Sequence, residues 1–177
     1  MKIYAIRHGQ TNSNLNRIVQ SWTNNPLNQN GITQAIKMGQ FLQHQGYHFD
    51  HIYSSPLDRA IKTAELIQEY LYIKKPIMIH EAFIERNFGP FEGGSIDIAA
   101  KAIAQPNFRM NGFEHDEALL QRVEKGLKDL YLKHPNDHVL LSCHSHVVKS
   151  LLILSDPKQY DYRVLLNNAS MCIFDYD

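Results

Sequence analysis

The sequence predicts an α/β layered domain, because strand-like runs alternate with helical patterns along its 177 residues. Several of these runs are apolar at successive positions, which is typical of strands in a covered, largely parallel sheet. The length favours a single domain over residues 1–177, with irregular loops at about 16–30 and 83–114 over one rim of the sheet. Ligands of such sheets gather at the carboxyl ends of the strands.

The predicted elements follow one another along the chain. Five segments have the apolar and β-branched character of strands: 2–6, 51–55, 76–82, 138–143 and 171–176. Helical patterns of apolar residues cover 31–45, 56–71 and 115–133, and a last one begins near Ser145 or His146. Gly46 ends the first helical pattern and Pro135 the third. Ser55 is suited to cap the second helix, with Pro56 at its first position.

Charge and hydropathy limit the classes of function. Lys plus Arg and Asp plus Glu number 18 each, so the net charge is zero with neutral histidines. That balance argues against a broad surface for nucleic acid or an anionic membrane, which needs an excess of positive charge. The sequence has no signal-peptide pattern and no apolar run of ~18 residues, so we expect a cytoplasmic protein without membrane contact.

The two cysteines, Cys143 and Cys172, both lie in apolar runs. We interpret them as buried thiols of a protein in a reducing compartment. A disulfide between them stays possible if their strands are neighbours. A nucleophilic role for Cys143 is disfavoured. Adjacent strand residues point to opposite faces, and His144 is the one expected to face the ligand.

Three predicted strands lead into cationic or imidazole side chains: Arg7 and His8 after 2–6, Arg59 after 51–55, and His144 after 138–143. If the strands are parallel, these side chains share one edge of the sheet. Two helices are predicted to begin there, and their N-termini add free N–H groups and positive dipole ends. Because guanidinium groups match phosphate oxygens bidentately, the edge is predicted to bind a phosphate group.

Five segments, taken in order, carry a resemblance to a known family: "RHGQTNSN", "LNQNGITQA", "YSSPLDRAIKTAELI", "ERNFGPFEG" and "SCHSHVVKSLL". Together they resemble the histidine phosphatase superfamily, also called phosphoglycerate mutase-like, over nearly the whole chain. The first is similar to the family's Arg-His-Gly-x-[Ser/Thr]-x-x-Asn signature and the third to its Ser-Ser-x-x-x-Arg-Ala-x-x-Thr-Ala segment. The resemblance implies a three-layer α/β/α sandwich with a central, mostly parallel sheet.

The resemblance also implies site residues and their roles. His8 is the nucleophile that forms a phosphohistidine, and Glu85 is the general acid that protonates the leaving oxygen. The phosphate-binding positions are Arg7, Asn14, Arg59 and His144. Gln20 and Ser145 are further candidates for substrate contacts, and Ser145 stands where the family commonly has glycine. Neither a cofactor nor a metal ion is predicted.

Glutamates other than Glu85 leave alternatives open. Glu92 is a second candidate acid, and its place in "FEGG" also suits a turn-stabilising role. Glu85 itself could form a salt bridge with its neighbour Arg86. The region of Glu114 and His115 departs from the family's pattern, so the role of both residues stays open.

A metal-dependent site is a further possibility. His8, His144 and His146 could act together as metal ligands. Two adjacent arginines would repel a divalent cation, and no carboxylate triad accompanies the histidines. We therefore expect catalysis without a metal ion.

The predicted function is hydrolysis of small-molecule phosphomonoesters by a metal-independent histidine phosphatase. Mutase-type transfer is less favoured, because the segment 86–115 is short and offers few cations: Arg86, Lys101 and Arg109. Two more functions stay open, those of a protein phosphatase and of a catalytically idle phospho-ligand binding module. Specificity is expected from 16–24 and 86–115, with candidates Gln20, Trp22, Arg109, Phe113 and His115. The sequence names neither the substrate nor an oligomeric state.

Overall fold

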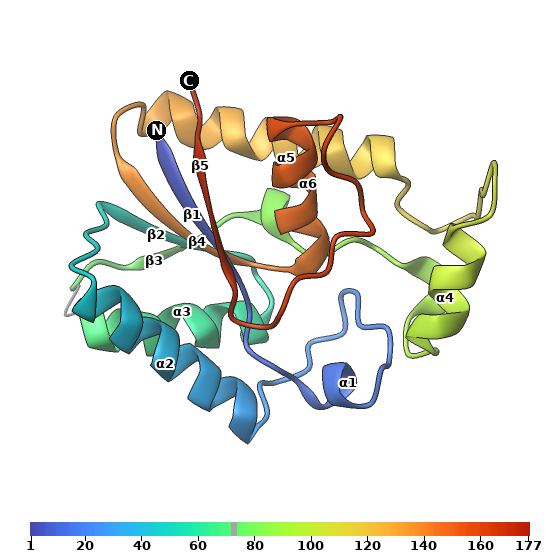
Figure 1. Ribbon diagram of the computed structural model, residues 1–177, viewed down its shortest axis with the longest axis horizontal. Helices are drawn as coiled ribbons and strands as arrows, with labels where there is room; N and C mark the ends of the chain where they lie inside the picture. The colour runs from blue at the N-terminus through green and yellow to red at the C-terminus, as the bar shows by residue number, and fades with distance from the viewer. Residues whose placement is uncertain (72–73) are drawn as a thin grey trace.

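The computed structural model describes residues 1–71 and 74–177, and its strands form one five-stranded sheet (Figure 1). The order is β3-β2-β4-β1-β5, built from β1 (Lys2–Arg7), β2 (His51–Ser54), β3 (Ile77–Ile79), β4 (His138–Cys143) and β5 (Met171–Asp175). β1 to β4 run parallel, and β5 pairs with β1 in the antiparallel sense. The predicted mostly parallel sheet is confirmed.

Helices cover both faces of the sheet. On one face lie α2 (Gln29–His44) and α3 (Asp58–Leu71), and on the other α5 (Asp116–Lys133) and α6 (Ser145–Ser155) (Figure 1). Successive residues of β1 enter different cores: Ile3 and Ala5 pack with α5 and α6, whereas Tyr4 and Ile6 pack with α2 and α3. The strands are apolar on both faces for this reason, and the predicted three-layer sandwich is confirmed.

β3 is shorter than the predicted strand 76–82. It ends at Ile79, and the His80 side chain accepts a hydrogen bond from the Ala82 N–H at 3.2 Å. This contact begins the 3-10 helix η1 (Glu81–Phe83). A side chain that bonds the backbone two residues further on competes with strand pairing. The extended run therefore gives way to a turn.

The start of α3 also differs from the prediction. The helix begins at Asp58, so Ser55 is not its N-cap and Pro56 is not its first residue. The carbonyl of Leu57 accepts the first backbone hydrogen bonds of the helix instead. The Ser55 hydroxyl is consequently available to a neighbouring strand end.

The two rim loops pack on each other beside the carboxyl edge of the sheet. The second loop is not irregular throughout, because it contains η2 (Gly89–Phe91) and α4 (Ile96–Ile103), while α1 (Asn12–Leu15) precedes the first loop (Figure 1). Val19 of the first loop packs with Phe88, Ala99 and Phe113 of the second in a small separate core. We call these two packed loops the rim cap.

Within the described part of the chain, no helix combines the length and apolar character needed to cross a bilayer. Both cysteines are free thiols, with Cys143 buried and Cys172 half-buried. The interpretation of the cysteines as thiols is confirmed, although Cys172 is less buried than predicted.

Candidate active site

His8 lies just past the end of β1 and is 2% exposed. Its backbone N–H donates to the carbonyl of Cys143 on β4 at 2.9 Å, which continues the pairing of the two strands. The ring Nδ1 lies 2.7 Å from the Gly9 carbonyl, which can only accept, so Nδ1 carries the proton and Nε2 keeps its lone pair. Burial, together with Arg59 and Arg7, holds the pKa of His8 well below its ordinary value. The imidazole is therefore neutral and nucleophilic.

Two guanidinium groups flank His8, one from the half-buried Arg7 and one from the fully buried Arg59. Arg7 ends β1 and donates to the Leu166 carbonyl, while Arg59 lies in the first turn of α3 and is fully buried. Burial lowers the pKa of Arg59 to about 10, so the group stays cationic at neutral pH. Within residues 1–71 and 74–177, neither arginine forms an ion pair with a carboxylate, and the Nε of each is buried without a hydrogen-bond partner. The pair thus supplies positive charge and free donors.

Arg59 also ties the site to the rim cap. It donates to the carbonyls of Ser21 at 2.8 Å and Thr23 at 2.9 Å, both in the first rim loop. These contacts fix the guanidinium plane and leave Nε unpartnered. The sequence predicted Arg59 as a site residue but gave no sign of this link.

His144 brings a second imidazole from β4. It occupies the N-cap position of α6, and its ring centroid lies 5.2 Å from that of His8. Its Nε2 is 2.6 Å from the Ser55 hydroxyl, and its buried Nδ1 has no partner. Burial and the nearby Arg59 hold the pKa of His144 well below its ordinary value. The Ser55 hydroxyl thus contacts this histidine and also accepts a hydrogen bond from the Leu57 N–H at 3.3 Å, just before α3, although Ser55 is not the N-cap of that helix.

Glu85 follows η1 and is 5% exposed. Its Oε1 accepts hydrogen bonds from the backbone N–H of Arg86 at 2.8 Å and of His146 at 3.3 Å. Burial raises the pKa of Glu85, opposed by the hydrogen bond from the Arg86 N–H and by the positive charges of Arg59 and Arg7. A carboxyl group with a raised pKa is suited to donating a proton.

The Arg86 side chain does not pair with Glu85, so the salt-bridge interpretation is wrong. Its guanidinium is 2.7 Å from Asp116 and lies over the Tyr162 ring at 4.3 Å. Glu92 accepts from the backbone N–H groups of Ser21 and Trp22 in the first rim loop. That geometry fits its turn-stabilising interpretation.

Sequence reasoning missed the residue that holds the Glu85 segment. Arg122 on α5 donates to the carbonyls of Ala82 at 2.7 Å and Ile84 at 2.9 Å, and it forms an ion pair with Glu114 at 2.8 Å. Glu114 also accepts from the N–H of Asn87 at 3.0 Å. Glu114, whose role the sequence left open, is therefore part of a clamp around the chain that carries Glu85. No local sequence signal links these positions.

The remaining predicted contacts lie around the same edge. The Asn14 Oδ1 accepts from the side chain of Asn168, which also donates to the His8 carbonyl. The Gln20 Oε1 accepts from Thr11 at 3.0 Å, and its buried Nε2 has no partner. Ser145 is the first residue of α6, directly after His144.

The residues predicted to set substrate specificity differ in exposure and in the part of the rim where they lie. Trp22 is 48% exposed, and its Nε1 donates to the Glu85 carbonyl at 2.8 Å. Phe113 is buried in the core of the rim cap. Arg109 and His115 line a separate cavity of about 280 Å³ on that cap. His146 packs its ring against Phe88 and Tyr162.

The geometry defines the class of protein. A neutral buried imidazole lies between two largely buried cations without ion-pair partners, at the carboxyl edge of an α/β sheet. This arrangement is suited to phosphoryl transfer, which depends on positioning and charge stabilisation. The particular family follows from comparison with known proteins. The histidine phosphatase superfamily (branch 1) matches residues 3–177, and the chain belongs to this family.

Relatives and solved structures agree with this assignment. The chain is 35% identical over 150 residues to the uncharacterized phosphatase PhoE of Bacillus subtilis (strain 168), covering 85% of this chain and 75% of the relative. A phosphoserine phosphatase mutant from Entamoeba histolytica in complex with phosphoserine is 27% identical, with a TM-score of 0.82 and coverage of 99% of this chain and 91% of that chain. Phosphoglycerate mutase from Bacillus anthracis str. Sterne is 26% identical, with a TM-score of 0.85 and coverage of 98% and 86%. The predicted family, fold and phosphatase activity are confirmed.

Proposed function

We propose that the protein hydrolyses small phosphomonoesters through a phosphohistidine on His8, without a metal ion. The observation that carries the proposal is the His8 ring, whose Nδ1 is held by the Gly9 carbonyl while its pKa lies well below the ordinary value. The free Nε2 attacks phosphorus in line with the leaving oxygen. An N–P bond forms as the P–O bond to the leaving group breaks.

Arg7, Arg59 and His144 stabilise the charge on the transferring group. The support is that each has a buried nitrogen without a partner, and that no carboxylate pairs with either arginine in the described residues. Donors already fixed by the fold need no reorganisation when charge develops, which makes them effective in the transition state. Asn14 supplies a further polar contact, in agreement with its position beside the His8 backbone through Asn168.

Glu85 acts as the proton donor and then as the base. Its carboxyl proton passes to the leaving oxygen, and the resulting carboxylate takes a proton from the water that attacks phosphohistidine. A bound phosphate adds negative charge beside a carboxyl group whose pKa burial already raises. Both effects favour the protonated acid in the first step.

The substrate is proposed to be a small molecule. His8, Arg59 and His144 are at most 2% exposed, so only a compact phosphoryl group reaches them directly. The phosphoserine bound to the related Entamoeba phosphatase is in line with a substrate of this size. A cytoplasmic location is part of the proposal and is supported by the two free thiols.

The test is phosphate release from a panel of phosphomonoesters in the presence of EDTA, comparing the protein with its His8→Ala variant. Phosphoserine, 3-phosphoglycerate, p-nitrophenyl phosphate and a phosphopeptide cover the competing functions. The proposal predicts turnover of small esters that EDTA does not reduce and that His8→Ala abolishes.

Different outcomes would identify a different function. Isomerisation of 3-phosphoglycerate without phosphate release would identify a mutase, and preference for the phosphopeptide would identify a protein phosphatase. Tight phosphate binding with no turnover on the whole panel would identify an idle binding module.

A further inference from the structure

A second cluster of side chains lies at the amino end of the sheet, opposite the candidate active site. His51 begins β2, His134 is the C-cap of α5, and Asp137 directly precedes β4. β2 runs from His51 to Ser54, and the next residue, Ser55, contacts His144. At about 3.3 Å per residue, this places the two groups roughly 10–13 Å apart along the strand. The cluster is therefore separate from the residues proposed for catalysis.

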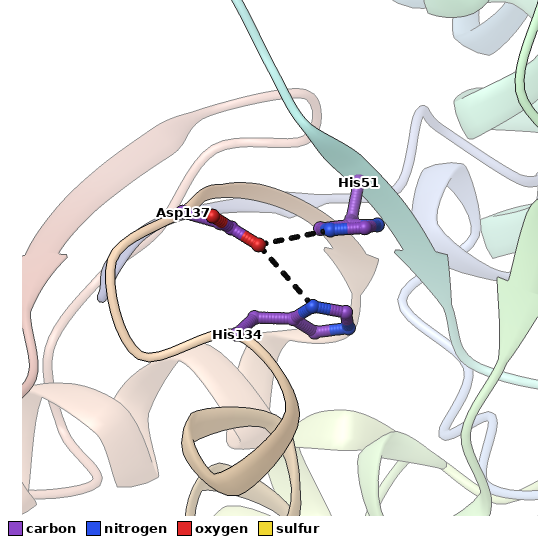
Figure 2. Close-up of side chains that lie close together, drawn as sticks. All are labelled: His51, His134 and Asp137. Atoms are coloured by element: carbon purple, nitrogen blue, oxygen red, sulfur yellow. Dashed lines mark hydrogen bonds and ion pairs between the residues drawn. The ribbon is translucent and has the colours of Figure 1, made fainter.

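The three side chains converge on one point (Figure 2). The Asp137 Oδ2 lies 3.0 Å from the His51 Nε2 and 3.3 Å from the His134 Nδ1. One potential ligand atom from each residue lies within 4.8 Å of the others. In the described chain, this is the one group of three histidine, cysteine or acidic side chains that meets such a spacing.

We propose that His51, His134 and Asp137 bind a Zn²⁺ ion, with water as a fourth ligand. Zinc takes imidazole nitrogen and carboxylate oxygen at about 2.0–2.2 Å in tetrahedral geometry, which separates ligand atoms by roughly 3.3 Å. The two separations from Asp137 are already close to that value. Mg²⁺ and Ca²⁺ prefer all-oxygen sets, so a set with two imidazoles selects against them.

Ligation requires the two histidine rings to rotate apart. Their centroids are 3.7 Å apart at an interplanar angle of 31°, and a shared metal would open this contact because it must lie in the plane of both rings. The side chains of His51 and Asp137 are 27% and 37% exposed, so they have room to adjust and water can reach them. The same exposure gives a metal ion access from solvent.

Tyr53 provides the supporting contact that a ligating histidine requires. Its hydroxyl lies 2.9 Å from the His134 Nε2. When Nδ1 binds a metal, the ring proton resides on Nε2 and donates to this hydroxyl, which fixes the tautomer and the ring orientation.

A metal at this position would tie the start of β2 to the connection between α5 and β4. Both segments belong to the folded core, so binding should stabilise the native state by mass action. It should leave catalysis unchanged, since no proposed catalytic residue is a ligand. The site is thus proposed as a structural or storage position, and not as part of the reaction.

The test is a zinc titration of the metal-free full chain, read by calorimetry and by thermal unfolding. We expect one zinc equivalent that is lost in His51→Gln and in the milder Asp137→Asn, with Kd raised at least about 10–100-fold. At a zinc concentration about 100-fold above Kd, the melting temperature should rise by roughly 5–10 °C in the unchanged protein. His48→Gln is the matched control, because His48 is exposed, lies three residues from His51 and is not a member of the cluster.

Two results would overturn the proposal. One is the same zinc stoichiometry and the same thermal shift in the unchanged protein, His51→Gln and Asp137→Asn, which would place any bound zinc elsewhere, including the histidines of the active site. The second is no zinc binding by the unchanged protein at millimolar concentration, which would leave the cluster as a hydrogen-bonded network alone.

Discussion

The two ends of the sheet differ in whether their charged and polar side chains have partners. At the carboxyl edge, Arg7 and Arg59 are largely buried, and no carboxylate in the described chain forms an ion pair with either of them. At the amino edge, His51 and His134 share a carboxylate oxygen of Asp137 and remain partly open to water. The carboxyl edge thus holds largely buried cations without ion-pair partners, and the amino edge holds polar side chains that are hydrogen-bonded to one another.

This difference shows where the fold is organised around a ligand. Burying a charge without a partner costs free energy of folding, whereas a half-exposed hydrogen-bonded cluster costs little. The carboxyl edge therefore keeps an arrangement that becomes favourable when a phosphoryl group supplies the missing negative charge. Substitutions there should change activity more than stability, and substitutions at the amino edge should do the reverse.

After the loss of the nucleophile His8, the largest effect is expected for Glu85→Gln. Single-turnover formation of the phosphoenzyme from phosphoserine should slow by about 10²–10⁴, because the basic alkoxide leaves without a proton. The loss should be much smaller with p-nitrophenyl phosphate, whose leaving group is a stable anion. An equal loss on both substrates would contradict the role of Glu85 as a proton donor.

The pH dependence of phosphoenzyme formation is a second test of the role of Glu85. Glu85 is an effective acid only while protonated, and burial raises its pKa. The rate with phosphoserine should therefore fall as the pH rises through that value. Glu85→Gln should remove this fall in rate at high pH. If the fall persists in the variant, it reports the titration of a group other than Glu85.

Arg59→Met tests the unpaired charge directly. The fall in kcat/KM should be about 10²–10³, since the variant lacks a donor to the transferring group. Removing a buried cation without an ion-pair partner relieves a desolvation cost, whereas losing its two hydrogen bonds to rim carbonyls removes stabilisation. Because these two contributions oppose each other, the free energy of unfolding should change little. Urea unfolding measures this second quantity, and a loss of about 3–5 kcal/mol would show that Arg59 is mainly structural.

A smaller effect is expected for Glu114→Gln, which weakens the clamp on the Glu85 segment. Misplacement of a catalytic group by about 1 Å can reduce kcat by up to about 10²-fold, with little change in KM. Glu124→Gln on the exposed part of α5 is the matched control, because Glu124 pairs only with Lys128 among the described ion pairs. A lower melting temperature with unchanged kcat would reduce Glu114 to a structural role.

The smallest effect on activity is expected for Asp137→Asn at the amino edge. In the absence of zinc, kcat should stay within about twofold, and the free energy of unfolding should fall by about 0.2–1 kcal/mol, as for partly exposed pairs. Steady-state kinetics and urea unfolding of the metal-free protein measure both. A large loss of kcat would show that the two edges of the sheet are energetically coupled.

Much of the fold could be predicted because its strands carry a strong pattern. β1 and β4 are apolar at successive positions, since both faces of the sheet are covered, and their ends place His8 and His144 at one edge. The predicted ends of β3 and α3 were wrong because side chains there make contacts that the sequence pattern does not show. His80 uses its side chain to begin a turn, and Ser55 contacts His144 in place of capping a helix.

The supporting parts of the site could not be predicted in the same way. The contacts of Arg122 with the Glu85 segment, and of Arg59 with the rim carbonyls, join segments far apart in sequence. Polar residues on helices and loops look alike in sequence whether they face solvent or hold another segment. The cluster of His51, His134 and Asp137 was missed for the same reason, because β2 and β4 must pair before its members meet.

The role of His8 as the nucleophile is tested most directly by trapping the phosphoenzyme. The protein is incubated briefly with a labelled phosphomonoester and EDTA, denatured in alkali to preserve phosphohistidine, and mapped by mass spectrometry. We predict one acid-labile phosphoryl group on His8, formed and discharged fast enough to carry turnover and absent from His8→Ala. Steady turnover with no label on His8, or with the label on another residue, would contradict it.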